Sequence, residues 1–253
     1  MILAARHPQA PRTGLPGTVR DVLLTLVVCA IIAGCATQSP RPAEAAATTP
    51  ADFPLRYYRD ALARGEPVYR IDPRLSLVVI EVRRAGTLAR LGHDHVIASH
   101  DLQGLVAPTD GRADLYVALD RLVIDETQLR SDAGFDTQPS EDDIAGTRRN
   151  MLNALQAEQY PFARVAVSTV DLGSTGSKLK VALTLQETTR QFEVPVQIES
   201  AIDAVSVKGS LAFLQTDFGM KPLSVLGGAI QVQDQIDLRF QIRATRIWRA
   251  DDT

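Results

Sequence analysis

Period-two alternation of apolar and polar residues is the feature that most limits how this chain can fold. In residues 234–245, Ile236, Leu238, Phe240 and Ile242 alternate with polar side chains. Successive side chains of a strand point to opposite sides, so the pattern predicts a strand with one dry and one wet face. The alternation recurs in seven further segments: residues 75–83, 96–107, 113–124, 162–172, 177–186, 190–200 and 204–213. Eight such strands are enough to close an antiparallel barrel around side chains or one small ligand.

One helix is expected between the third and fourth of these strands. Ser140 has the residue type of an N-cap, and three acidic residues follow it in the first turn. Apolar residues then recur at helical spacing, at Ile144, Met151 and Leu155. The sequence therefore predicts a mainly β fold, an eight-stranded antiparallel barrel with one helix between strands 3 and 4.

The N-terminus predicts export and lipidation. Three arginines precede an apolar run at residues 22–33, which has the length of a signal-peptide core and is too short to span a bilayer. The run ends in the letters IAGC, which resemble a bacterial lipobox and imply cleavage before Cys35 and acylation of its sulfur, with fatty acids such as palmitate. Ala36 follows where an Asp would indicate inner-membrane retention. We expect a periplasmic protein whose acylated N-terminus anchors it to the membrane, the outer membrane being favoured.

These boundaries divide the chain into three parts. Residues 1–34 are the expected signal peptide. Residues 35–68 are the lipidated N-terminus, a flexible tether and a short helix, and residues 69–247 are the barrel domain. Removing the signal, with its three Arg and one Asp, changes the net charge from −3 to −5. An acidic domain without a basic tract is a poor binder of nucleic acid, so no nucleic-acid partner is expected.

Three of the four histidines lie within twelve residues, in the stretch RLGHDHVIASHD. His93 and His95 are two positions apart, which on a strand places both side chains on one face, and His100 could add a third metal ligand. A glycine precedes the pair, however, and His, Asp and Gly are ordinary residues of turns and barrel rims. We favour a polar hairpin with no metal, and keep a metal site at His93, His95 and His100 as the alternative.

Other signatures of catalysis do not occur in the sequence. No serine lies in a nucleophile-elbow context, and no glycine-rich loop precedes a helix to hold phosphates. Cys29 leaves with the signal and Cys35 is acylated, so thiol chemistry and disulfides are not expected either. The sequence favours a non-catalytic protein without a cofactor.

Four short motifs in one order resemble the YceI-like family of bacterial periplasmic proteins. They are YRIDPRLS from Tyr69, HDLQGLV with Gly104, the hairpin ALTLQETTRQFEVPV, and TDFGM with Phe218. The resemblance spans about residues 69–245. Three positions depart from the family pattern: Gln215 in place of an Arg, Glu187 in place of a turn glycine, and the GHDH letters. If those positions touch the polar end of a ligand, the ligand class differs here.

The resemblance implies a lipocalin-like barrel that holds an isoprenoid or another long lipid. By this carry-over the inward rows of the strands line the cavity, at Leu115, Val117, Leu119, Leu183, Leu185, Val194, Val196, Leu211, Phe218, Leu238, Phe240 and Ile242. A barrel with a solid core that acts as an interaction module remains a third hypothesis, because alternation alone does not separate a packed barrel from a hollow one.

Overall fold

The computed structural model describes residues 48–169 and 177–248, so the expected signal peptide and Cys35 lie outside the described residues. The described strands form one antiparallel sheet. They are β1 (Tyr69–Ile71), β2 (Leu77–Ala85), β3 (His95–Ser99), β4 (Gln103–Ala107), β5 (Arg112–Ala118), β6 (Val123–Ile124), β7 (Phe162–Thr169), β8 (Lys178–Leu185), β9 (Thr188–Ser200), β10 (Ala204–Leu214), β11 (Ser224–Val225) and β12 (Ile230–Arg246).

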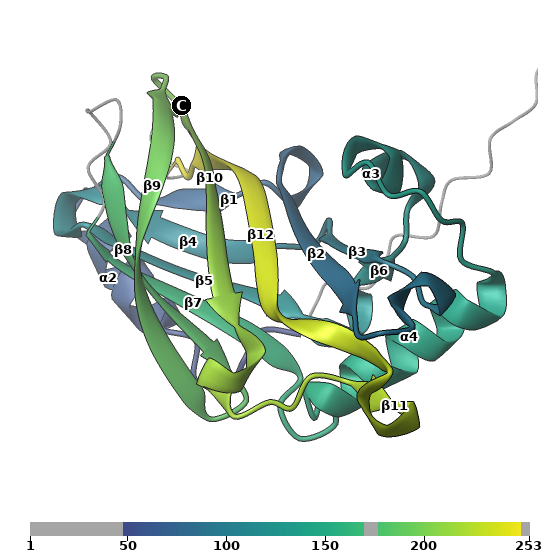
Figure 1. Ribbon diagram of the computed structural model, residues 1–253. Helices are drawn as coiled ribbons and strands as arrows, with labels where there is room; N and C mark the ends of the chain where they lie inside the picture. Colours follow the sequence, from purple (N-terminus) through teal and green to yellow (C-terminus); the bar gives the residue numbers. More distant parts are fainter. Residues whose placement is uncertain (1–47, 170–176, 249–253) are drawn as a thin grey trace, which may run out of the picture. The chain divides into compact units, whose positions relative to one another are not determined.

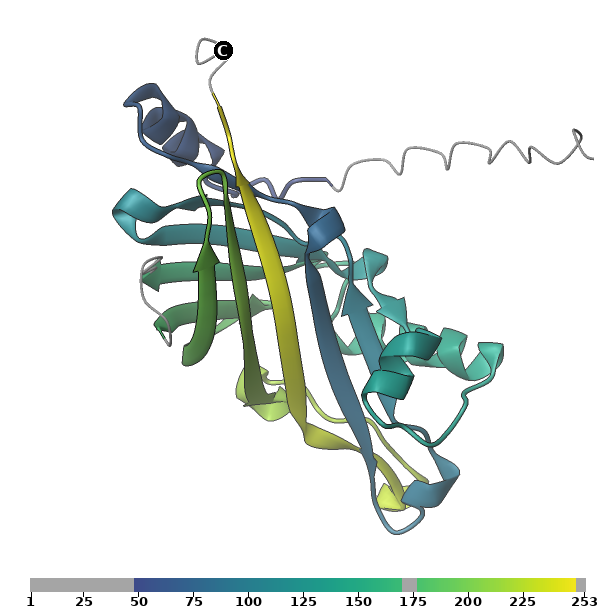
Figure 2. The same cartoon turned by 90° about the horizontal axis from the view of Figure 1, so that it is seen from above.

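Eight strands close into a ring, so the predicted antiparallel barrel is confirmed. The order around the ring is β1, β4, β5, β7, β8, β9, β10 and β12, and β12 pairs with β1 to complete it. The 17-residue β12 makes the closure possible, since it pairs with β10 along one edge and with both β2 and β1 along the other. Figure 1 shows it in yellow across the front of the barrel, and Figure 2 shows its length beside β2.

Two of the predicted strands are each broken in two. The prediction of an unbroken strand at residues 96–107 is wrong, because the chain leaves the ladder at residues 100–102 between β3 and β4. Asp101 there receives hydrogen bonds from Gln103 and Arg121 instead. The predicted strand at 113–124 likewise divides into β5 and β6 around a 3-10 turn at Leu119–Arg121. A short strand that was not predicted, β1, continues the line of β2 along β12.

In the described part of the chain, three α-helices accompany the sheet: α2 (Leu55–Ala63), α3 (Thr127–Asp132) and α4 (Glu141–Ala154). The helix predicted between strands 3 and 4 is α4, and its capping box is formed by Ser140 and Asp143, each of whose side chains binds the other's backbone N–H. Helix α3 was not predicted. Helix α2 packs through Tyr58 and Ala61 against a cluster that includes Ala107 of β4. Among the described residues, no helix has both the length and the apolar character that a membrane crossing requires.

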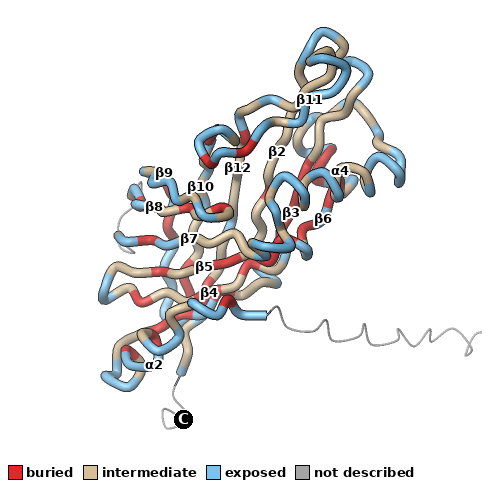
Figure 3. The backbone as a smooth tube through the Cα atoms, turned by 90° about the horizontal axis from the view of Figure 1, so that it is seen from below, coloured by how far each residue is buried: buried red, intermediate tan, exposed pale blue. Residues whose placement is uncertain are grey.

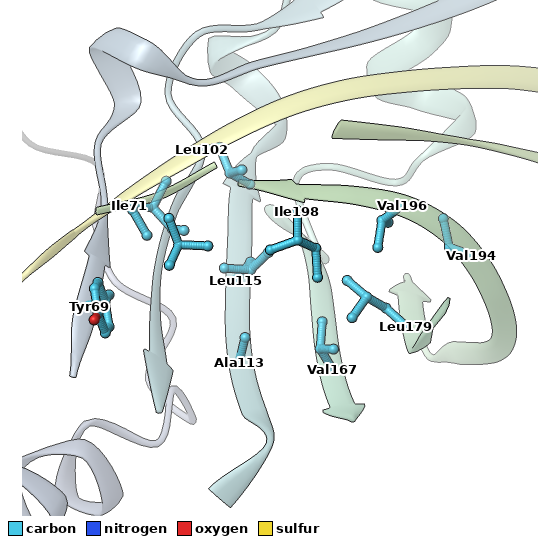
Figure 4. Packing of buried hydrophobic residues seen from close by; sticks show 12 residues of the cluster. Tyr69, Ile71, Leu102, Ala113, Leu115, Val167, Leu179, Val194, Val196 and Ile198 are labelled. Carbon is cyan, nitrogen blue, oxygen red and sulfur yellow. The ribbon is translucent and has the colours of Figure 1, made fainter. Parts of the chain in front are cut away.

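The inward rows of the strands meet inside the barrel. Figure 4 shows side chains from β1, β5, β7, β8 and β9 pointing toward one another, among them Ile71, Leu115 and Val194. Gly104, part of the HDLQGLV motif, is needed because a Cβ at this position would collide with the carbonyl oxygen of Asp114 on the neighbouring strand. In Figure 3 the buried residues follow these strands, whereas the connections around β11 are exposed.

Candidate functional site

The barrel encloses an apolar cavity of about 960 Å³. This volume lies at the upper end of the range of small-molecule sites. Many aliphatic side chains that face it are only half-buried, for example Val78, Val181 and Val207. In a barrel with a filled core these inward side chains would be fully buried. The barrel is therefore hollow, and the solid-core hypothesis is wrong.

Ten of the twelve residues expected to line the cavity do so. They are Leu115, Val117, Leu119, Leu183, Leu185, Val194, Leu211, Leu238, Phe240 and Ile242. Contact of these residues with a ligand remains a prediction.

Val196 and Phe218 are buried but do not line the cavity, which corrects their expected place. A Cβ built on Gly209 would lie 2.7 Å from the ring of Phe240 and 3.1 Å from Val196, so both side chains converge over this glycine in a packed layer. Phe218 instead packs in an aromatic cluster, with ring centroids 5.4 Å from Phe213 and 6.5 Å from Phe192.

The cavity opens at one end of the barrel. Its exposed lining residues all come from three segments: the turn before β3, the helix α4 and the connection around β11. They include Leu91, Asn150, Lys221, Leu223 and Val225. We call this end the mouth. At the other end, the lining residues Tyr69, Ile71 and Ala244 are buried.

Polar lining residues are concentrated at the mouth. The side of α4 that faces the cavity carries polar residues, among them Asp143, Thr147 and Asn150, while Met151 and the C-cap Leu155 add apolar surface at its C-terminal end. His93 and His95 lie on the turn and strand opposite α4 and also line the cavity. An amphipathic ligand would therefore place its apolar chain deep in the barrel and its polar end at the mouth.

A chain of hydrogen bonds runs from the mouth into the protein. Thr147 Oγ1 lies 3.2 Å from His95 Nε2, and His95 Nδ1 lies 2.6 Å from Asp125 Oδ2. Asp125 Oδ1 accepts from the backbone N–H of Val96 at 3.0 Å and from Arg130 at 2.6 Å. The side chain of Asp125 is completely buried, so its charge is stabilised only by these partners. The chain fixes the orientation of the His95 ring.

Arg130 forms an ion pair with the carboxylate of Asp125. Its side chain is 7% exposed, and it also donates to the backbone carbonyl of Asp94 at 2.5 Å and to that of Thr137 at 2.6 Å. A buried guanidinium with several acceptors is a satisfied charge, and it holds the ends of β3 and α3 together.

The pKa of Asp125 lies below its ordinary value. Burial alone would raise this pKa, but the hydrogen bonds from His95, Val96 and Arg130 together outweigh burial. Asp125 is therefore a carboxylate at neutral pH, and the proton of the shared hydrogen bond is assigned to His95 Nδ1.

The three histidines do not converge, so the alternative metal set of His93, His95 and His100 is wrong. His95 contacts Asp125, whereas His100 lies just beyond the other end of β3, with its Nε2 2.8 Å from Glu126 Oε1. Five residues of extended strand place His95 and His100 roughly 16 Å apart. Among the described residues, no group of three or more His, Cys, Asp or Glu side chains is arranged to hold a metal ion.

The sequence analysis did not identify Asp125 or Arg130 as parts of the site. A signal for Asp125 existed, because pairing the ends of the second and third predicted strands places Asp125 opposite Val96, next to His95. Arg130 had no comparable signal, since it lies on α3, which the sequence pattern did not indicate. Two of the three departures from the family pattern, Gln215 and the GHDH histidines His93 and His95, line the cavity.

A closed antiparallel barrel with an apolar cavity open at one end defines a lipocalin-like barrel of the ligand-binding class. The YceI-like domain family matches residues 69–244, and the chain belongs to this family. No curated protein matches the chain.

The chain is similar to solved structures. A polyisoprenoid binding domain from Saccharophagus degradans, implicated in plant cell wall breakdown, is similar with a TM-score of 0.50 and 14% identity, over 71% of this chain and 98% of that chain. BcnA from Burkholderia cenocepacia has a TM-score of 0.46 and 15% identity, over 69% of this chain and 99% of that one. At 14% identity, the similarity to the Saccharophagus degradans domain shows the fold alone.

Replacing Asp125 by Asn tests the buried carboxylate. Because the pKa of Asp125 is lower in the folded protein than in the unfolded chain, its stabilising contribution is present above the ordinary value of 3.8 and is lost as the pH falls below it. We expect Asp125→Asn to lower the free energy of unfolding at neutral pH by about 3 kcal/mol. Measured by denaturant titration between about pH 6 and pH 3, the variant should also lose stability less steeply than the wild type.

The exposed Glu158 provides the control, as Glu158→Gln removes a carboxylate of the described surface. If Asp125→Asn leaves the stability and its pH profile as unchanged as Glu158→Gln does, the buried ion pair is not the structural element described above.

Proposed function

We propose that this protein is a non-catalytic carrier of an apolar chain, an isoprenoid or a lipid of similar length, which it holds inside the barrel. The observation that supports this most directly is the half-buried state of the inward aliphatic residues around a cavity of about 960 Å³. Leaving apolar surface accessible costs free energy, about 25 cal/mol for each Å², and an apolar ligand would recover it.

Membership of the YceI-like family supports the same class of ligand. The structurally similar domain from Saccharophagus degradans is a polyisoprenoid binding domain, which is consistent with an isoprenoid chain as the ligand here.

The hydroxyl, imidazole and carboxylate of Thr147, His95 and Asp125 are in the order of a nucleophilic triad. Acyl transfer also requires donors for an oxyanion. Thr147 lies inside α4, where the neighbouring N–H groups donate to carbonyls one turn earlier in the helix. These donors are not available to a substrate, so the arrangement favours binding over acyl transfer.

The lipobox-like segment supports a second part of the proposal, attachment to the bacterial membrane from the periplasmic side. Acyl chains on Cys35 would hold the barrel near a bilayer, since several chains give stable anchoring where a single chain does not. The residues between Cys35 and α2 would then act as the tether, and the outer membrane is the favoured location. An anchored barrel stays close to the source of an apolar ligand.

Filling the cavity tests the carrier function. Val181 on β8 faces the cavity, and its neighbour Lys180 is exposed on the outer face of the same strand. We expect Val181→Trp to weaken the binding of an apolar fluorescent dye by at least about tenfold, which corresponds to about 1.4 kcal/mol. Lys180→Trp adds the same side chain outside and should leave the dissociation constant unchanged. Equal binding by both folded variants would contradict a ligand inside the barrel.

Labelling with radioactive palmitate tests the anchor. In a bacterial host, Cys35→Ser should abolish incorporation of label and release the protein from the membrane fraction, because no acyl chain remains to bury. Cys29→Ser removes the other cysteine and should remain labelled. Persistent labelling of Cys35→Ser would contradict the assigned lipidation site.

A further inference from the structure

We propose that the mouth recognises an uncharged end group that donates a hydrogen bond, a hydroxyl at the end of the apolar chain, through Thr147 and His93. This inference rests on the proposed function, because it concerns the polar end of the same ligand. It is carried by the direction of the hydrogen bonds at the mouth.

Toward a ligand, the hydroxyl of Thr147 can act only as a hydrogen-bond acceptor. Asp125 accepts the short hydrogen bond from His95 Nδ1, and the tautomer that this bond selects carries its lone pair on Nε2. Thr147 Oγ1, at 3.2 Å, then donates its proton to that nitrogen. The remaining lone pairs of the Thr147 hydroxyl can only accept, and Thr147 lines the cavity.

His93 offers a second acceptor beside it. The rings of His93 and His95 lie with their centroids 6.2 Å apart, and both residues line the cavity. His93 Nε2 lies 3.6 Å from Asp143 Oδ2, which is too long for a hydrogen bond, but the nearby carboxylate favours the tautomer with its proton on Nε2. His93 Nδ1 then carries the lone pair, and this nitrogen is shielded from solvent without a hydrogen-bond partner in the described structure. A buried acceptor without a partner costs free energy, and a ligand that donates a hydrogen bond to it removes this cost.

The charges at the mouth select against an anionic end group. Asp142 and Asp143 both line the cavity here and repel a phosphate or a carboxylate. Arg84 also lines it, but it lies between Asp94, at 3.4 Å, and Asp136, at 2.9 Å, so its charge is already balanced. Lys221 is exposed to solvent at the rim, where screening weakens its attraction.

A series of chains that differ only at the end group tests the inference. Geranylgeraniol donates and accepts, its methyl ether only accepts, its monophosphate is anionic, and geranylgeranylamine is cationic. Each would be titrated against the purified chain preloaded with an apolar fluorescent dye. We expect the alcohol to bind about tenfold more tightly than the methyl ether and the monophosphate, the effect of one well-made hydrogen bond.

Thr147→Val removes the hydroxyl and keeps the shape of the side chain. It should reduce the preference for alcohol over ether to about twofold, and continued binding of the ether shows that the cavity of the variant is intact. His93→Leu should reduce the same preference. Thr189→Val, on the exposed outer side of β9, is the matched control and should retain the full preference.

The outcomes separate the two proposals. If alcohol and ether bind equally to the wild type, or if the monophosphate or the amine binds most tightly, the end-group inference is overturned while the carrier function stands. Retention of the full alcohol preference in both Thr147→Val and His93→Leu also overturns it. If none of the four compounds displaces the dye, the carrier function itself fails, and the inference fails with it.

Discussion

Closure of the sheet through β12 is the constraint on which the other features of the barrel depend. This strand pairs with β10 on one edge and with β2 and β1 on the other, so no edge of the eight-stranded ring is left open there. Once the ring closes, every inward row faces the same interior. Those rows consist mostly of valine and leucine rather than large aromatic residues, and side chains of this size do not fill the space between opposite walls. The cavity is thus a consequence of closure combined with small inward residues.

The mouth makes the two ends of the cavity chemically different. After β5 the chain leaves the closed ring at the turn Leu119–Arg121 and enters β6, which α4 contacts at this end. The helix contributes both polar residues and the apolar Met151 to the lining, and the buried Asp125 and Arg130 hold His95 against it. A buried ion pair contributes little net stability when compared with apolar packing, but it fixes geometry, and here the group that it fixes faces the ligand space.

The sequence predicted the parts of the fold that depend on local periodicity. The eight passes of the sheet and the capped helix α4 follow from side-chain alternation and from Ser140, which are properties of short segments. The breaks at residues 100–102 and 119–121 were not predictable in this way, because the apolar pattern continues across them while the pairing partner changes. Ten cavity-lining residues could be predicted, because every second side chain of a strand points to the same face. The sequence could not show that Val196 and Phe218 lie outside the cavity lining. Tertiary packing decides this, beside Phe240 for Val196 and against Phe213 for Phe218. The role of the GHDH histidines depends on Asp125 and Arg130, which come from elements later in the chain.

Native mass spectrometry of the chain purified without detergent tests the central claim, that the barrel holds an apolar chain. The folded protein should carry extra mass relative to the denatured protein, because denaturation releases a bound ligand and leaves covalent acyl groups in place. Extraction with organic solvent should remove that mass, and the extract should contain a lipid or an isoprenoid. Equal folded and denatured masses, together with no uptake of geranylgeraniol by the folded protein, would contradict a carrier. A smaller extra mass that a chelator removes would point to a bound metal instead and contradict the arrangement described here.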